Sequence, residues 1–222
     1  MLYVQDLRVN IRRLAILRGV TLEVPAGTIV ALVGRNGAGK TTTLRAVMGL
    51  VPASGGSITL DGSDLLRVPA HGRAALGIGY MPEDRRLIPQ LTVEENLLLP
   101  AWANRMSDAT GRLRDLYERM PALAAFASRR AGHLSGGQQK LVAAARAMMT
   151  ADRVLLLDEP FEGLAPALVG ALGSVLRGLA QEGRAVLVAE SEHTHVAALA
   201  HRAHTIERGE TVGCRRWKNT GC

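Results

Sequence analysis

A glycine-rich segment carries the clearest chemical pattern in the sequence: Gly34, Gly39, Lys40 and Thr41 have the spacing G-x-x-x-x-G-K-[ST]. Glycines let backbone N–H groups curl around phosphate oxygens, and a following helix adds its positive dipole end. Lys40 would reach the β- and γ-phosphates of a nucleotide, and the Thr41 hydroxyl would bind Mg²⁺. A glycine-rich turn with an incidental lysine is the alternative. The predicted phosphate-binding residues are Gly34, Arg35, Asn36, Gly37, Ala38, Gly39, Lys40, Thr41 and Thr42.

Two adjacent carboxylates, Asp158 and Glu159, follow an apolar run at residues 154–157 that predicts a buried strand. Ligands of α/β proteins bind at the carboxyl ends of parallel strands, so both carboxylates are suitably placed for a nucleotide. Asp158 is predicted to hold Mg²⁺ through water. Glu159 is predicted to be catalytic together with Lys40, either as general base or by positioning the attacking water. A strand that ends in a solvated Asp-Glu turn is the alternative.

A third segment, with Ser135, Gly136, Gly137 and Gln138, opens a predicted helix over residues 135–150. The free N–H groups at a helix start form an anion site. The same Ser-x-x-Gln spacing is also a plain capping box, and taken alone the segment is more typical of that.

The elements that must position these residues alternate between strands and helices. Strands are predicted over residues 2–9, 20–24, 29–33, 57–60, 78–81, 153–157 and 185–189, with strand-like stretches near Thr205 and Thr211. Helices are predicted over residues 41–50, 69–77, 92–99, 108–120, 135–150, 167–182 and 193–200. This alternation predicts an α/β fold with a largely parallel sheet. We expect residues 1–222 to form a single domain.

The composition supports a folded domain, since 47% of the 222 residues are hydrophobic and 21% are charged. These values exclude a disordered tail, a collagen-like fibre and a coiled coil. The net charge of +7 favours an anionic partner such as a nucleotide, a nucleic acid or an acidic membrane surface, and is equally compatible with a basic surface that only aids solubility. The two cysteines form no disulfide framework, and no apolar run approaches the ~20 residues of a membrane span.

The order of the three motifs resembles that of the ATP-binding-cassette (ABC) ATPases, and the resemblance covers nearly the whole chain. It implies a P-loop core, an antiparallel β piece near the N-terminus and a helical subdomain inserted at about residues 82–150. ATP and Mg²⁺ are the implied cofactors. Two cassettes would pair head to tail, and hydrolysis at Glu159 would reopen the pair. The residues implied to contact the partner's nucleotide are Ser135, Gly136, Gly137 and Gln138.

Further segments resemble the second ATPase of branched-chain amino-acid importers: Pro-Glu-Asp-Arg-Arg at residues 82–86, Leu-Thr-Val-Glu-Glu-Asn-Leu at 91–97 and Gly-Leu-Ala-Pro at 163–166. Urea and short-amide importers use a similar subunit, so branched-chain or other hydrophobic amino acids rank first and urea or amides second. The implied location is peripheral, on the cytoplasmic face of the inner membrane.

The partners implied by this resemblance are membrane permease subunits, a second ABC ATPase in a homo- or heterodimer and, indirectly, a solute-binding protein. No nucleic acid is expected. Residues 83–102 would contact the permease, because Leu87, Ile88 and Leu91 are apolar within a predicted loop. Burial of these three side chains inside the helical subdomain is the alternative.

Three positions depart from the usual pattern of these ATPases. Glu83 lies where most members carry glutamine, and we expect it to bind Mg²⁺ and act in catalysis, or to be a solvated loop residue. Ile11 or Asn10 replaces the aromatic residue that stacks on adenine, which weakens the preference for ATP over GTP. Ser191 replaces the switch histidine and is expected to bond the γ-phosphate, unless a shifted loop brings in His193.

Two other classes of cassette remain as alternatives. The positive charge permits a DNA-repair or chromosome ATPase, but the interval from Lys40 to Ser135 leaves no room for the long coiled coil that those proteins carry. A regulatory cassette that binds ATP without turnover is disfavoured by Lys40, Thr41 and Glu159, while Ser191 keeps it open.

Two features near the C-terminus are expected to be unrelated to catalysis. Histidines at positions 193, 195, 201 and 204 suggest a metal site, but no cysteine or carboxylate set completes it, so surface and partly buried histidines are expected. Residues 213–222 form a basic, cysteine-bearing tail that we expect to be frayed, with contact to acidic lipid headgroups as the alternative.

Overall fold

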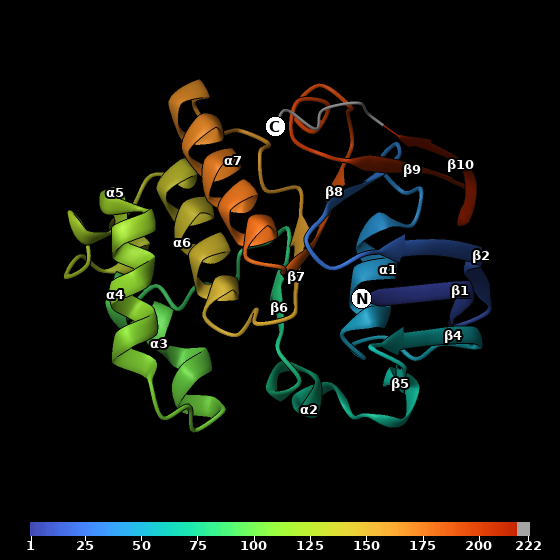
Figure 1. Ribbon diagram of the computed structural model, residues 1–222, viewed down its shortest axis with the longest axis horizontal. Helices are drawn as coiled ribbons and strands as arrows, with labels where there is room; N and C mark the ends of the chain where they lie inside the picture. The colour runs from blue at the N-terminus through green and yellow to red at the C-terminus, as the bar shows by residue number, and fades with distance from the viewer. Residues whose placement is uncertain (217–222) are drawn as a thin grey trace.

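The computed structural model describes residues 1–216. The strands are β1 (Leu2–Ile11), β2 (Leu14–Val24), β3 (Ile29–Val33), β4 (Gly55–Leu60), β5 (Ser63–Asp64), β6 (Ile78–Met81), β7 (Val154–Asp158), β8 (Ala185–Glu190), β9 (Arg202–Glu207) and β10 (Glu210–Arg216). Within residues 1–216 they join into one ten-stranded sheet in the order β5-β4-β1-β2-β10-β9-β3-β8-β7-β6 (Figure 1).

Most of the helices gather on one side of this sheet, as Figure 1 shows for α3 to α7. Two of them begin with a capping box, Thr92 with Glu95 at α3 and Ser135 with Gln138 at α6, so their first N–H groups have acceptors. The α-helices of the described part are α1 (Lys40–Val47), α2 (Ala70–Ala75), α3 (Val93–Ala103), α4 (Ala109–Arg119), α5 (Pro121–Ala124), α6 (Gly136–Met148) and α7 (Pro166–Gln181).

The half of the sheet that contains β3, β7 and β8, at whose ends the predicted site residues lie, is parallel. Strands β9, β3, β8, β7 and β6 run side by side in the same direction. β3 and β7 are buried along their whole length because almost every residue in them is aliphatic. The predicted α/β class with a P-loop core is confirmed. The carboxyl ends of β3, β7 and β8 meet at one edge of the sheet.

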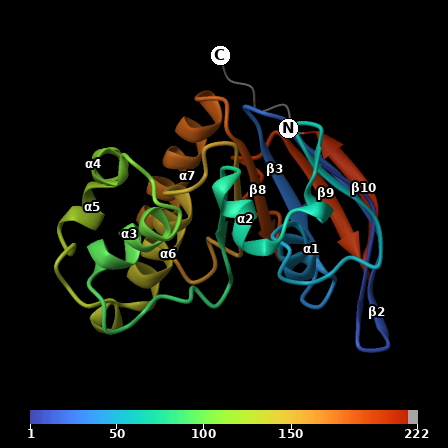
Figure 2. The ribbon, with the colours of Figure 1, turned by 90° about the horizontal axis from the view of Figure 1, so that it is seen from below.

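The other half of the sheet is antiparallel, as expected for the N-terminal β piece. β1 pairs with β2 and with β4, and β5 adds an edge. Helix α1 contacts strands from both halves, so it lies inside the curl of the sheet (Figure 2). The apolar faces of β1, β2 and α1 share one core cluster with one face of the parallel strands.

A second core cluster lies on the opposite face of the parallel strands. It joins apolar side chains of α3, α4, α6 and α7 to β3, β7 and β8. Figure 2 shows the group α3 to α6 set to one side, with α7 between this group and β8. Helix α6 contacts α3, β6, β7 and α7, so it links the helical group to the strands that end at the site.

The predicted helix over residues 193–200 is wrong. The segment forms isolated turns, in which Ala197 N–H donates to the His193 carbonyl and Ala200 N–H donates to the Val196 carbonyl. The next residue, His201, gives its N–H to the Ile29 carbonyl at 2.8 Å, which directs the chain straight into β9.

Two expectations for the chain ends also need correction. β2 begins at Leu14 rather than near residue 20, because a tight turn at Arg12, with a φ of 57°, extends the hairpin with β1. The tail is ordered at residues 213–216, where β10 pairs with β9, for instance Cys214 opposite His204. The rest of the tail that was predicted to be frayed or to contact lipid, residues 217–222 of 213–222, lies outside the described residues. In the part of the chain that is described, none of the helices combines the length and apolar character needed to traverse a bilayer.

Candidate active site

The loop that joins β3 to α1 is built for close approach of the backbone. A Cβ at Gly34 would lie 2.3 Å from the carbonyl oxygen of Ile206, and a Cβ at Gly39 would lie 2.6 Å from Leu17 Cδ2. Gly39 also has a φ of 116°, a conformation that favours glycine, and it precedes the first residue of α1. The loop therefore leads into a helix start whose N–H groups can bind an anion.

Lys40 is 4% exposed and connects this loop to the ends of two other strands. Its Nζ donates to the backbone oxygen of Gly34 at 2.7 Å and to Ser191 Oγ at 3.0 Å. The same Nζ forms an ion pair with Glu159 Oε1 at 3.1 Å. Because β3, β8 and β7 are parallel neighbours, their carboxyl ends bring together three residues that are far apart in the sequence.

Glu159 forms the turn after β7, with its backbone in the left-handed region at a φ of 50°. Its N–H donates to the Ala189 carbonyl at 2.9 Å, so the turn stays bonded to β8. Burial alone would raise the pKa of this carboxyl, but the Ser191 hydroxyl, Lys40 and Lys140 together lower the pKa below its ordinary value. The carboxylate is therefore ionised at neutral pH and can accept a hydrogen bond from water.

Asp158 is fully buried, and among the described residues neither carboxylate oxygen has a hydrogen-bond partner. Burial raises the pKa of Asp158 to about 6. Thr41 and Lys40 oppose this rise, and the Glu83 and Glu159 carboxylates add to it. An orphaned carboxylate with further oxygen donors nearby suits a hard divalent cation. The residues present fit Mg²⁺, and the oxygen donors available to it are those of Asp158, Thr41 and Glu83.

Ser191 follows β8 and contacts both charged groups of the site. Its Oγ accepts from Lys40 and lies 2.6 Å from Glu159 Oε1 and 2.7 Å from Asn36 Oδ1. The single hydroxyl hydrogen serves one of these two acceptors at a time. His193, the alternative considered for this position, is exposed two residues further on. A neutral hydroxyl, rather than an imidazole, therefore contacts the carboxylate.

The signature segment (Ser135, Gly136, Gly137 and Gln138) begins α6 at some distance in the fold from the P-loop. Gln138 N–H donates to Ser135 Oγ at 3.3 Å and Ser135 N–H donates to Gln138 Oε1 at 3.0 Å, so the capping box is present. Ser135 and Gly136 are exposed. Of the described residues, those that line the cavity around Lys40 include none of this segment. Among the described residues, neither the cavity around Lys40 nor the larger one beside Thr41 is lined by both the P-loop and the signature segment.

The cavity around Lys40 has a volume of about 460 Å³ and an aliphatic wall. The sequence offered Ile11 or Asn10 as the residue beside the base. Ile11 lines this cavity, and Asn10 is not among its lining residues. Ile16 lines it as well and was not predicted, because the strand that carries Ile16 was expected to start later. None of the described lining residues is aromatic, so a purine base would meet aliphatic side chains here.

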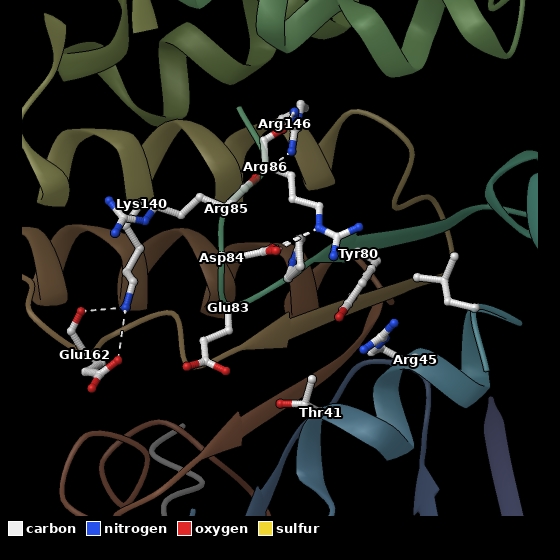
Figure 3. Close-up of a pocket in the computed structure, with 12 residues that line it drawn as sticks. Thr41, Arg45, Tyr80, Glu83, Asp84, Arg85, Arg86, Lys140, Arg146 and Glu162 are labelled. Atoms are coloured by element: carbon white, nitrogen blue, oxygen red, sulfur yellow. Dashed lines mark hydrogen bonds and ion pairs between the residues drawn. The ribbon is translucent and has the colours of Figure 1, made fainter. Parts of the chain in front are cut away.

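A larger cavity of about 710 Å³ lies between α1, the segment after β6 and α6 (Figure 3). Glu83 projects from that segment toward Thr41. The loop that carries Glu83 is held by Arg146 of α6, whose guanidinium donates to the backbone oxygens of Arg85 and Arg86 at 2.7 and 2.8 Å. Both of these residues have a positive φ, so the clamp holds a conformation that arginine rarely adopts.

Two cations of α6, Lys140 and Arg146, were not predicted to belong to this region. Lys140 is buried, and its Nζ donates to the backbone oxygens of Glu159 and Glu162. The sequence signal that could have found it is a lysine that enters the apolar face of a helix, since such a charge requires partners. The histidines near the C-terminus act separately: His201 Nδ1 accepts from the Ile29 N–H, and His204 faces Cys214.

A phosphate-binding loop, a buried carboxylate pair and a parallel sheet define a nucleotide hydrolase of the P-loop class. A profile of the family described as ABC transporter matches residues 17–162, which is more than half of the chain. The chain belongs to the ABC transporter family, and it is an ABC ATPase, as the sequence predicted.

Curated relatives and solved structures agree with this assignment. The high-affinity branched-chain amino acid transport ATP-binding protein BraG of Pseudomonas aeruginosa is 37% identical over 196 residues, 88% of this chain and 84% of that protein. A probable branched-chain amino acid transport ATP-binding protein, LivF of Archaeoglobus fulgidus, is 37% identical over 75% of this chain and 70% of its own length. The lipopolysaccharide export system ATP-binding protein LptB of Escherichia coli is 32% identical over 89% and 83%. A bacterial ABC transporter cassette has the same fold, with a TM-score of 0.89, 24% identity and coverage of 99% and 100%.

Proposed function

We propose that this ABC ATPase powers the import of branched-chain or other hydrophobic amino acids through membrane permease subunits. The observation that supports the catalytic part is the contact of Lys40 Nζ with Glu159 Oε1 at 3.1 Å, directly after the orphaned carboxylate of Asp158. A phosphate-binding cation, a carboxylate for water and a metal ligand meet at one edge of the sheet. The solute class is supported by the likeness to BraG and LivF.

In this proposal, residues 34–42 bind the phosphates of ATP through the backbone of the loop and the Lys40 ammonium. Thr41 and Asp158, with Glu83 beside them, would hold Mg²⁺, and the bound ion would supply positive charge that neutralises the phosphates. Ile11 and Ile16 cover the base without stacking on it, so the site accepts both ATP and GTP more evenly than an aromatic platform would.

Hydrolysis follows from an exchange of partners in the Lys40 cluster. Lys40 gives up its ion pair with Glu159 to bind the phosphates, which frees Glu159 Oε1 for the attacking water. The carboxylate orients that water or takes its proton while the water oxygen attacks the γ-phosphorus and ADP departs. Ser191 reaches the carboxylate from the other side and is placed to hydrogen-bond the γ-phosphate.

Two cassettes are proposed to pair head to tail. The signature segment supports this arrangement because it is exposed at the N-terminus of α6 and lines no part of the Lys40 cavity among the described residues. A helix start that carries glycines can bind the γ-phosphate of a nucleotide held by another chain. The partner is a second copy or a related ATPase.

The permease is proposed to dock on residues 83–102. Ile88 and Trp102 are 40% and 53% exposed there, whereas Leu87 packs partly buried against the helical core. This would hold the chain at the cytoplasmic face of the inner membrane, with the solute-binding protein acting on the permease from the opposite side. Lipopolysaccharide export is the second candidate function, favoured by the 32% identity to LptB.

The test combines ATP turnover with solute uptake. The chain is assembled with its native permease subunits in membrane vesicles, and the uptake of radiolabelled leucine is measured with and without ATP, with labelled urea in a parallel arm. We expect ATP-dependent leucine uptake, and a loss of about 100-fold or more in both turnover and uptake for Glu159→Gln, with ATP binding retained. Full turnover in Glu159→Gln would refute the catalytic assignment, and uptake of urea alone would refute the solute class.

A further inference from the structure

Lys140 is a buried cation whose close partners are two backbone carbonyls. It lies two residues beyond the signature segment, and its side chain is 8% exposed. Its Nζ donates to the backbone oxygen of Glu159 at 2.8 Å and to that of Glu162 at 2.6 Å. The Glu162 carboxylate is farther away, at 3.7 Å, and is 65% exposed (Figure 3). The ammonium is thus placed to hold the main chain rather than a surface charge.

The turn that Lys140 holds is one that glutamate adopts only under constraint. Glu159 has a φ of 50°, and such conformations persist only where the surroundings fix them. The Ala189 carbonyl fixes the N–H of Glu159, and Lys140 fixes its carbonyl oxygen. Because the main chain is held on both sides of the Glu159 Cα, the direction of its Cα–Cβ bond is set before the carboxylate meets any partner.

We propose that Lys140 is a positioning residue for ATP hydrolysis. It holds the turn of residues 159–162 in the geometry that directs the Glu159 carboxylate, and it ties this turn to the helix that begins with the signature segment. The inference rests on the proposed role of Glu159. Burial of the ammonium supports it, because a buried lysine costs free energy unless acceptors surround it, and the two carbonyls are the acceptors at hand.

The experiment uses the full chain, with permease where turnover requires it. Lys140→Met keeps the length and the apolar stem of the side chain and removes every donor. Lys140→Arg returns donors to the site. Arg177→Met is the matched control, because Arg177 is an exposed cation of α7 that contacts only Ser174 among the described hydrogen bonds. The quantities measured are kcat, KM, the dissociation constant of a fluorescent ATP analogue and the melting temperature.

The expected result is a split between turnover and binding. Lys140→Met should lower kcat about 10- to 100-fold, the usual penalty for a misplaced catalytic group, while KM and the analogue's dissociation constant stay within about threefold. Lys140→Arg should recover most of kcat, and Arg177→Met should match the wild type. If melting shows that Lys140→Met does not fold, Lys140→Gln replaces it. Its amide is one atom shorter and cannot reach both oxygens, so the same split is expected.

Two results would overturn the proposal. One is a folded Lys140→Met protein with the kcat of the wild type. The other is a loss of ATP affinity as large as the loss of kcat, which would indicate a general structural role. Glu159→Gln is measured alongside, because full turnover in that variant would instead refute the proposed role of Glu159.

Discussion

Replacing Asp158 with asparagine is expected to stabilise the protein against heat in alkaline buffer with a chelator, and to reduce strongly the stabilisation by Mg²⁺ with ATP. The wild-type carboxylate is fully buried, and neither of its oxygens has a partner among the described residues. Ionisation is therefore penalised in the folded state and not in the unfolded chain. Asparagine has nearly the same shape and carries no charge.

The magnitude follows from the pKa of Asp158, which burial raises from 3.8 to about 6. Each pH unit is worth about 1.4 kcal/mol, so the ionised carboxylate costs about 3 kcal/mol once the pH exceeds its folded-state pKa. Because folding raises this pKa, the carboxylate carries no penalty at a pH below the pKa of the unfolded chain. The penalty grows as the pH rises and is complete above the pKa of the folded protein. In the variant, burying the asparagine amide without good hydrogen-bond partners costs about 1 to 2 kcal/mol. The net gain in the free energy of unfolding is therefore about 1 to 2 kcal/mol. For a chain of this size, that gain raises Tm by about 2 to 8 °C.

Scanning calorimetry in EDTA at about pH 8 and about pH 4.5 measures this difference. The Asp158→Asn variant should melt above the wild type at the higher pH, and the difference should shrink at the lower pH. Addition of Mg²⁺ and ATP should raise the Tm of the wild type far more than that of the variant. A variant that melts below the wild type at the higher pH, or a difference that does not change with pH, would refute the reasoning.

Three further predictions test the dimer, the base site and the packing of the sheet. Glu159→Gln should shift from monomer to dimer when ATP is added, as measured by size-exclusion mass; a monomer in both conditions would contradict the homodimeric sandwich. Ile16→Tyr supplies a stacking ring worth about 0.5 to 1.5 kcal/mol, so steady-state KM values for ATP and GTP should fall about 2- to 10-fold, and unchanged values would place the base elsewhere. Gly79→Ala sets a Cβ 2.0 Å from the Ala147 carbonyl of α6 and should lower the free energy of unfolding by about 1 to 3 kcal/mol. Gly173→Ala, with open space at its Cβ in α7, should raise it by about 0.5 to 1 kcal/mol, and urea unfolding curves compare the two.

The parts of the site that could be predicted are those that depend on local sequence. The spacing of Gly34, Gly39 and Lys40 has one good structural solution, a tight loop before a helix, and the structure has that loop. The carboxylates after β7 follow from an apolar run that must be buried. Parallel packing then brings the ends of β3, β7 and β8 together, so the meeting of Lys40 with Glu159 is a consequence of the fold class.

The parts that could not be predicted depend on contacts between distant segments. Ile16 lines the cavity around Lys40 only because the hairpin of β1 and β2 extends beyond the apolar pattern that predicted it. Residues 193–200 form turns instead of a helix because the N–H of the next residue, His201, donates to the Ile29 carbonyl on β3 and draws the chain into β9. A lysine on the apolar face of a helix signals that Lys140 needs acceptors, but the sequence does not say which, since its partners are backbone oxygens of a distant turn.

The two lysines around Glu159 differ in what they hold, and this difference has a consequence for the reaction. Lys40 contacts the carboxylate, and in the proposed reaction the arriving phosphate draws it away and leaves the carboxylate free for water. Lys140 contacts the backbone of the same residue from α6, so it has no reason to leave when the phosphate arrives. A single cation could not both release the Glu159 carboxylate and keep it directed at the attacking water. With one lysine on the side chain and another on the main chain, the charge partner of Glu159 can change while its position stays fixed.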